Sequence, residues 1–463
     1  MTPSHKSFLA VVLIAALGVS GCATVSKYNP FKKTAPAEVA EGERISIVAA
    51  DETLTPAEAL KGVDFSIPPA AAMADWPLPG GTPEQSTENI EAAPALTVAW
   101  RKDIGQKTKG GKFVTAPPIA AGGRIFTMDS EAEVSAHDAK SGSEVWRVNL
   151  RPTDNRRDKE AFGGGIAFAG GKLYVTSGYR QVAQLDAATG AIGWRVSTEE
   201  PIHAAPTVVG GRVMVVALDN TLMTFDAASG APGWTYQALS ESARILSASS
   251  PAVQGDTVVA SFGSGELVAL RTSNGNDLWN VALSRASRTS ALSEIRDIAG
   301  RPVIYQGDVF AVSHSGVFAA TDLRTGQSRW TLPVVGITSP LPEGDVVYVV
   351  AKDGQLICVS RESGQIYWMR DLNEGFAAAP ENKRHWYKLW IKGKRLEPIW
   401  SGPILASGRL IMVGSSGELA AVNAKTGVVE RRMELGAPAL MSPIAAGGMV
   451  YVVTDNAQLI ALR

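Results

Sequence analysis

The sequence predicts an all-β fold, an eight-bladed β-propeller of four-stranded antiparallel blades. The first reason is a repeated motif, in which seven glycines are each followed four positions later by tryptophan or, in the last copy, by arginine. Successive tryptophans, counted from Trp100, lie 38 to 51 residues apart, the length of a four-stranded blade. Apolar runs before the glycines alternate in the manner of strands. The pairs are Gly142 and Trp146, Gly190 and Trp194, Gly230 and Trp234, Gly275 and Trp279, Gly326 and Trp330, Gly364 and Trp368, and Gly427 and Arg431.

Each residue of the motif has a structural reason. Glycine supplies the positive φ that a tight turn between the third and fourth strands requires. An aspartate four residues before it, as at Asp186, can accept hydrogen bonds from the turn amides. The tryptophan can pack its flat face between neighbouring blades and donate its indole N–H to a carbonyl. A tryptophan stripe could instead hold a cofactor, but its regular spacing favours structural wedges. These are Trp100, Trp146, Trp194, Trp234, Trp279, Trp330 and Trp368.

The two ends of the chain predict how the ring closes. The last strand, from Gln458, ends at the C-terminus without a tryptophan strand after it. One tryptophan remains at the other end, Trp100, in an apolar run with no glycine turn before it. Pairing the strand around Trp100 with the C-terminal strands completes an eighth blade and removes an exposed sheet edge.

The N-terminus predicts export and lipidation. Residues 1–21 are expected to be a signal peptide, since the apolar run from Phe8 to Val19 is too short to span a bilayer. The run ends in Leu17-Gly18-Val19-Ser20-Gly21-Cys22, which resembles a bacterial lipobox, so Cys22 is the expected lipidation site. The alternative is a buried cysteine in an uncleaved helix. The residue after Cys22 is Ala23 and not an aspartate. By resemblance to enterobacterial sorting rules, this indicates sorting to the outer membrane, with the chain on the periplasmic side.

Residues 22–74 are expected to form an acidic tether rich in alanine and proline. The formal net charge of the chain is −1, yet residues 37–94 carry eleven acidic residues against Arg44 and Lys61. Such a composition is typical of a flexible segment with local order. A short helix with a capping box is expected over residues 55–60. From Asp75-Trp76-Pro77 onward we expect the chain to dock against the blades, so the propeller domain is placed at 75–463.

One insertion, residues 381–400, interrupts the repeat. It interleaves basic and aromatic residues around Lys392-Gly393-Lys394, a pattern that predicts a hairpin. Basic and aromatic residues together could bind nucleic acid or lipid headgroups. The other interpretation is an extra hairpin over one propeller face with its charges in water. We favour this second interpretation and expect no nucleic-acid partner, because a signal peptide directs the chain away from nucleic acid.

No motif for catalysis or metal binding is found. The five histidines are not at metal-ligand spacing, and the two cysteines are Cys22 and Cys358. Cys358 lies in an alternating strand and is expected to be a buried apolar residue. We therefore expect no catalytic residue, no cofactor and no metal.

The repeat, clearest at Leu185-Asp186-Ala187-Ala188-Thr189-Gly190-Ala191-Ile192-Gly193-Trp194, resembles that of pyrroloquinoline-quinone (PQQ) dehydrogenases. Together with the lipobox and eight compact blades, residues 75–463 resemble the BamB family, propeller lipoproteins of the outer-membrane β-barrel assembly machine. The resemblance implies a non-enzymatic scaffold, monomeric within a hetero-complex. Its partners would be the barrel-inserting component and unfolded outer-membrane proteins added at a sheet edge. The alternatives are a periplasmic ligand-binding propeller and a PQQ-dependent dehydrogenase, which would need a quinone, Ca²⁺ and, in alcohol-oxidising relatives, adjacent cysteines that are absent here.

The same resemblance implies where the partner binds. The matching inter-blade segments are residues 240–246 and 293–298, each directly before the first strand of a blade and therefore on one face. The predicted contact is an apolar anchor with a charged rim. In the other interpretation Ile245 and Leu246 tuck under the blade and Arg244 pairs with Asp297. The predicted partner-binding residues are Arg244, Ile245, Leu246, Arg296 and Asp297.

Overall fold

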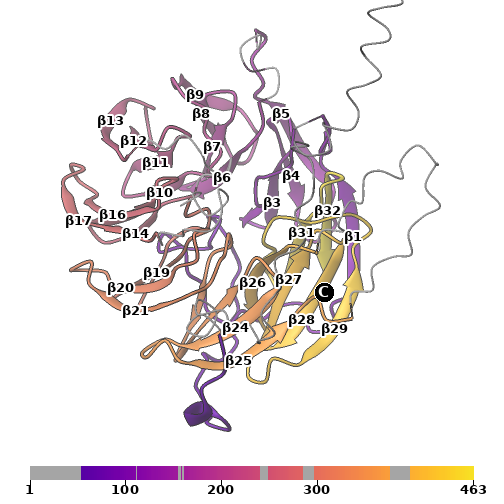
Figure 1. Cartoon of the computed structure of the whole chain (residues 1–463). Coiled ribbons are helices and arrows are strands. Elements are labelled where there is room, and N and C mark those ends of the chain that lie inside the picture. The colour runs from indigo at the N-terminus through magenta and orange to yellow at the C-terminus, as the bar shows by residue number, and fades with distance from the viewer. Residues whose placement is uncertain are drawn as a thin grey trace, which may run out of the picture. The chain divides into compact units, whose positions relative to one another are not determined.

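The computed structural model of the chain describes residues 54–110, 112–154, 158, 161–239, 249–284, 297–375 and 397–463. Within them, strands β1 to β32 form eight four-stranded antiparallel sheets arranged radially around one axis (Figure 1). The predicted eight-bladed propeller is confirmed. One short 3-10 turn, η2 (Glu58–Leu60), precedes the blades.

In blades 1 to 7 the strands follow the chain from the axis outward, and in blade 8 the outer strand is β1. Blade 1 contains β2 (Ile119–Ala121), β3 (Arg124–Met128), β4 (Glu133–Asp138) and β5 (Glu144–Asn149). Blade 2 contains β6 (Gly164–Ala169), β7 (Lys172–Ser177), β8 (Gln181–Asp186) and β9 (Ile192–Ser197). Blade 3 contains β10 (Thr207–Val209), β11 (Arg212–Val216), β12 (Thr221–Asp226) and β13 (Pro232–Gln237). Blade 4 contains β14 (Ala252–Gln254), β15 (Thr257–Ser261), β16 (Glu266–Arg271) and β17 (Asp277–Ala282).

The second half of the ring repeats this order. Blade 5 contains β18 (Val303–Tyr305), β19 (Asp308–Val312), β20 (Phe318–Asp322) and β21 (Ser328–Leu332). Blade 6 contains β22 (Leu341–Glu343), β23 (Val346–Val350), β24 (Gln355–Ser360) and β25 (Ile366–Asp371). Blade 7 contains β26 (Trp400–Ala406), β27 (Arg409–Gly414), β28 (Glu418–Asn423) and β29 (Val429–Glu434). Blade 8 contains β30 (Ile444–Ala446), β31 (Met449–Val453), β32 (Gln458–Leu462) and β1 (Val98–Asp103).

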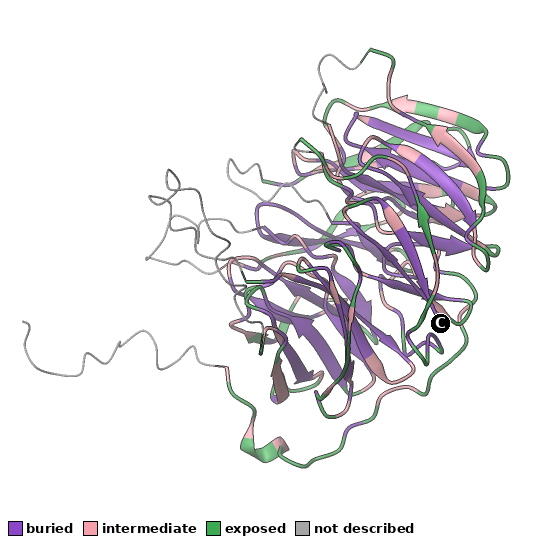
Figure 2. Ribbon diagram, turned by 90° about the vertical axis from the view of Figure 1, so that its right-hand side faces the viewer, coloured by how far each residue is buried: buried purple, intermediate pink, exposed green. Residues whose placement is uncertain are grey.

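The core lies between the blades. Because side chains alternate across a sheet, Val347 and Val349 of β23 pack toward blade 5, whereas Tyr348 packs toward blade 7. All five residues of β23 are buried, while the outer strand β29 has no buried residue. Figure 2 shows this gradient from buried inner strands to partly exposed outer strands. Cys358 is fully buried in this core with a free thiol, as predicted.

The tryptophan wedges join each blade to the next. A Cβ built on Gly190 would lie 2.8 Å from the Trp146 ring, and all seven motif glycines meet the preceding tryptophan in this way. Only glycine therefore allows the ring to lie flat on the turn. The motif aspartate also acts as predicted, since Asp186 Oδ1 accepts hydrogen bonds from the Thr189 N–H and hydroxyl at 3.1 and 3.0 Å.

The indole hydrogen bond was predicted for every wedge, and this is wrong for two of them. Five indoles donate to the carbonyl after the motif aspartate position, such as Trp146 to Ala187 at 3.1 Å. The indole N–H groups of Trp100 and Trp368 have no partner. In both cases a tyrosine hydroxyl donates to the equivalent carbonyl: Tyr451 to Ala139 at 3.2 Å, and Tyr348 to Ala424 at 2.9 Å.

Arginine replaces tryptophan where the ring closes. The eighth blade has no glycine turn before its outer strand, because that strand comes from the N-terminal side of the chain. Arg431 instead donates from Nη1 to the carbonyl of Ala95 at 2.6 Å. The eighth blade itself confirms the prediction, with β1 pairing antiparallel to β32 through Trp100 opposite Ala461.

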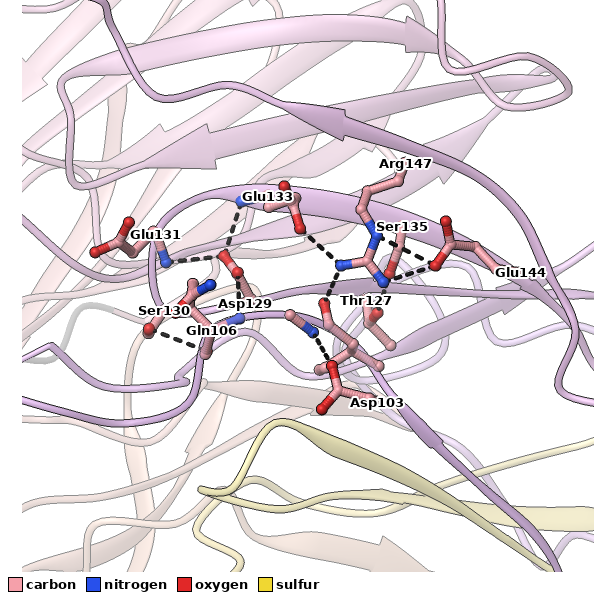
Figure 3. A network of polar contacts seen from close by, with 12 residues as sticks. Asp103, Gln106, Thr127, Asp129, Ser130, Glu131, Glu133, Ser135, Glu144 and Arg147 are labelled. Carbon is pink, nitrogen blue, oxygen red and sulfur yellow. Dashed lines mark hydrogen bonds and ion pairs between the residues drawn. The ribbon is translucent and has the colours of Figure 1, made fainter.

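A polar network then ties blade 8 to blade 1 (Figure 3). Asp129 accepts hydrogen bonds from the backbone N–H groups of Gln106, Glu131 and Glu133 at 2.7 to 2.9 Å. Arg147 pairs with Glu133 and Glu144, and also donates to the Ile104 carbonyl at 3.0 Å. The chain leaving β1 is therefore fixed to the first blade directly after the closure.

Residues 54–97, here called the N-terminal segment, contact the blades, and these contacts begin at Ala57, whose N–H donates to the Ile366 carbonyl at 2.9 Å. Figure 2 shows the segment running from η2 along one side of the blades. The expected helix is only the 3-10 turn, without a side-chain cap. The segment forms hydrogen bonds with one residue or more of every blade, including Ala120, Phe168, Thr207, Val253, Ile304, Asp345, Leu405 and Gly448.

Candidate functional site

The two faces of the ring differ. In an antiparallel four-stranded blade, the fourth strand ends on the face where the first strand of the next blade begins; we call this the connection face. The opposite face, the turn face, carries the turns between the first and second strands and between the third and fourth strands. The N-terminal segment contacts the turn face, since Asp75 accepts from the Gly122 N–H at 2.9 Å and Asn89 from the Gly408 N–H at 3.0 Å. Near the axis, the turn face is therefore occupied by the chain itself.

The predicted interface segments follow outer strands, β13 and β17, that end on the connection face. Residues 240–246 lie between β13 and β14, and residues 293–298 lie between β17 and β18, one blade apart. Arg244, Ile245, Leu246 and Arg296 lie outside the described residues. Asp297 is described and is only 1% exposed, and its carbonyl accepts a hydrogen bond from the His314 N–H at 2.9 Å. A substitution of Asp297 would therefore affect packing as well as any contact with a partner.

Exposed apolar side chains mark the same face. Leu239, directly before the first predicted segment, is 67% exposed. Phe113, Val335 and Leu440 are 43%, 40% and 42% exposed and lie in the connections before β2, β22 and β30. Sequence reasoning missed Leu239, because a leucine two residues beyond an alternating strand is usually core. Its position beside a polar segment was the available signal.

An axial cavity of about 300 Å³ lies in the ring. Residues at the start of the first strands of all eight blades line it, and Trp76 and Gln85 of the N-terminal segment line it as well. Because the segment contacts the turn face, the cavity has the segment on one side and the connection face on the other. The wedge tryptophans are not among the residues that line this cavity.

The ionisable side chains among the described lining residues are basic. Among the described residues that line it, the basic ones are Arg301 and His203, and no aspartate or glutamate is present. The Nε of Arg301 is buried without a hydrogen-bond partner. Burial lowers the pKa of Arg301 to about 10, so the guanidinium stays charged at neutral pH. Sequence reasoning missed Arg301 because it stands between Gly300 and Pro302 in a connection without any motif.

Within the described ranges, no group of three or more His, Cys, Asp or Glu side chains lies together in a way that could hold a metal ion. Over those ranges, no helix has the length and apolarity to cross a membrane. The predicted insertion at 381–400 lies mainly outside the described residues, and its last residue, Trp400, opens β26 and is buried.

Eight four-stranded blades, with a tryptophan packed on a turn glycine at seven of the eight seams, define a propeller of the PQQ-like repeat class. Within this class the chain belongs to the BamB family, because the family model described as "Outer membrane protein assembly factor BamB" matches residues 92–154, 130–370 and 379–463. The protein of that name from Alkalilimnicola ehrlichii is 32% identical over 80% of this chain and 88% of its own length. The resemblance predicted from the sequence is confirmed.

Solved structures agree with the fold. BamB from Moraxella catarrhalis superposes with a TM-score of 0.64 at 20% identity, covering 79% of this chain and 99% of that one. Quinohemoprotein alcohol dehydrogenase from Comamonas testosteroni gives a TM-score of 0.65 at 14% identity, covering 85% and 81%. The fold alone does not distinguish an assembly factor from a dehydrogenase. The family assignment does, and it agrees with the expectation of a non-enzymatic chain.

Proposed function

We propose that this chain is a scaffold lipoprotein that assists the assembly of outer-membrane β-barrel proteins. The observation that carries the proposal is membership of the BamB family over most of the chain, including a relative at 32% identity. A closed ring with seven tryptophan seams is a rigid disc, which is what a scaffold requires. Its turn face is occupied near the axis by the N-terminal segment, so the connection face remains for a partner.

The partner we propose is the barrel-inserting component of the assembly machine. Residues 240–246 and 293–298 would contact it, with Leu239 as an added apolar anchor because it is 67% exposed beside the first segment. Arg244 and Arg296 would supply the charged rim, whereas Asp297 is buried and would support the segment from below. Unfolded outer-membrane proteins would be bound at outer strands such as β29, which has no buried residue.

We further propose that Cys22 carries the lipid that anchors the chain to the periplasmic side of the outer membrane. Multiple acyl chains give firm anchoring, because each buried CH₂ contributes about 0.8 kcal/mol. Changing Cys22 to Ser should move the chain into the soluble periplasmic fraction without changing its melting temperature. If the Cys22→Ser chain still sediments with outer membranes in high salt, a contact other than lipid holds it there.

Co-purification tests the proposed partner. The tagged full-length chain is isolated from detergent-solubilised outer membranes, and its partners are identified by mass spectrometry. We expect the barrel-inserting component with the wild type, and its loss with Leu239→Glu and with Arg244→Glu. Val63→Glu is the matched control, since Val63 is an exposed apolar residue (49%) on the N-terminal segment. Retention in both connection-face variants, with melting temperatures unchanged, would place the interface elsewhere.

A further inference from the structure

We propose that the axial cavity is a binding site for a small hydroxylated oxyanion, held by the guanidinium of Arg301. This inference goes beyond the proposed scaffold function and does not depend on it. It rests on the position of Arg301, on the absence of an acidic partner for it among the described residues, and on two buried side-chain oxygens of the lining residues, Gln85 Oε1 and Thr115 Oγ1, that have no hydrogen-bond partner.

The backbone places Arg301 firmly at the cavity wall. Gly300 approaches blade 6 so closely that a Cβ on it would lie 2.5 Å from the carbonyl oxygen of Thr338. The next N–H, that of Arg301, donates to the Ser339 hydroxyl at 2.9 Å. These two contacts fix the connection before β18 against the connection before β22. The site is therefore built from two blades rather than from one loose loop.

Arg301 is partly buried, and its charge has no carboxylate partner within the described residues. Other arginines at blade edges have carboxylate partners: Arg147 pairs with Glu133 and Glu144, and Arg329 pairs with Asp308 and Asp322. Within the described residues, no carboxylate forms an ion pair with Arg301, and none lines the cavity. A charge withdrawn from water is costly unless it is paired. An oxyanion entering the cavity would provide that pairing.

The remaining lining groups define the ligand further. A guanidinium matches the geometry of a carboxylate or a phosphate, to which it can donate two parallel hydrogen bonds. Hydroxyl groups of Ser249, Ser250 and Ser339 lie around the cavity. Two side-chain oxygens of lining residues, Gln85 Oε1 on the N-terminal segment and Thr115 Oγ1 in the connection before β2, are buried without hydrogen-bond partners. Gln85 itself is only 4% exposed, and its amide nitrogen donates to the Thr207 hydroxyl and to the Pro251 carbonyl.

Gln85 Oε1 can only accept a hydrogen bond, and the Thr115 hydroxyl can accept or donate one, so a ligand with hydroxyl groups as well as an anionic group matches these atoms together with Arg301. A volume of about 300 Å³ is at the lower end of the range for ligand cavities, so the molecule must be small. The carboxylate and phosphate forms of this chemistry are represented by citrate and glycerol 3-phosphate. Glycerol has the hydroxyl groups without the charge and serves as the neutral control.

Isothermal titration of the full-length chain in detergent, at constant ionic strength, tests the site. We expect citrate or glycerol 3-phosphate to bind at millimolar concentration or below and glycerol not to bind; which anion binds identifies the source. Arg301→Gln should weaken binding by at least about tenfold. Arg324→Gln is the matched control, since Arg324 is an exposed arginine on the same blade, and it should bind like the wild type.

Each result of the titration either supports the anion site or overturns it. Equal affinity in the wild type and Arg301→Gln, or no binding of either anion to the wild type, would overturn the proposal. If Arg301→Gln does not fold, crystals of the wild type soaked in the bound anion decide, with electron density at the guanidinium expected and a cavity without it contradictory. Co-purification with Arg301→Gln distinguishes the site from the scaffold function, because the partner should be retained while anion binding is lost.

Discussion

The turn face and the connection face of this ring are made by the same eight repeats, yet they differ in what they leave available. On the turn face, the N-terminal segment forms hydrogen bonds with every blade and buries Trp76 to 2% exposure. On the connection face, Leu239, Phe113, Val335 and Leu440 are exposed and the axial cavity begins. The axis of a propeller is open to both faces unless the chain covers one of them. Here the chain uses one itself, which leaves the other for a partner or a ligand.

Both faces depend on the closed ring, so the loss of closure should have the largest effect on the stability of the fold. Deleting Gln458–Arg463 removes β32, which pairs with both β1 and β31 and whose residues Leu459 to Leu462 are fully buried. We expect this deletion to abolish cooperative unfolding in calorimetry. The matched deletion of residues 24–53, which precede the docked segment, should leave the melting temperature unchanged. Similar melting temperatures for the two deletions would refute closure by the chain termini.

The attachment of the N-terminal segment to the turn face can be weakened by one substitution at Trp76. Trp76→Ala removes a buried side chain whose backbone exchanges hydrogen bonds with Ala120 at 2.6 and 2.9 Å. Loss of a buried tryptophan costs about 3–5 kcal/mol of unfolding free energy. Val63→Ala, at an exposed position of the same segment, should cost within about 0.5 kcal/mol. Urea titration measures both, and a Trp76→Ala loss as small as that of Val63→Ala would mean that the segment is only loosely attached.

A buried acid beside the segment predicts a smaller, pH-dependent effect. Glu343 in β22 is fully buried, and burial together with the nearby Glu88 raises the pKa of Glu343 well above its ordinary value. The folded state therefore favours the protonated carboxyl. Its stabilising contribution is complete below the unfolded pKa of about 4.3 and is lost as pH rises through the folded pKa.

Glu343→Gln should remove this dependence. The melting temperature of Glu343→Gln minus that of the wild type should increase from acidic pH toward pH 8. Glu362→Gln, at an exposed position of the same blade, controls for the loss of one negative charge. A difference that is constant with pH would show that Glu343 titrates alike in the folded and unfolded chain.

The repeat made the blades predictable, because each motif acts locally. Glycine, aspartate and tryptophan lie within one turn and its neighbour, so their spacing alone indicated the blades and the seams. The closure was also predictable, since Trp100 was left without a glycine turn. The absence of a hydrogen bond from the Trp100 and Trp368 indoles was not predictable. Tyr451 and Tyr348 donate to the equivalent carbonyls from strands that the motif does not include.

The site was less predictable, since it depends on contacts between distant residues. The N-terminal segment has no periodicity, and its path across eight blades follows from contacts with residues up to 366 positions away, as between Thr97 and Arg463. Arg301 could be identified as a cavity residue only from the structure, because contacts between the connections before β18 and β22 place it there. The burial of Asp297 could not be read from a segment that is polar in sequence.

The most direct test of the account compares the two faces by site-specific photo-crosslinking in cells. A photoreactive amino acid at Leu239 (67% exposed) probes the connection face, and one at Val63 (49% exposed) probes the N-terminal segment on the turn face. We predict a crosslink from Leu239 to the barrel-inserting component and none from Val63. A crosslink from Val63 without one from Leu239 would contradict the account, because the partner would then bind the face that the chain itself occupies.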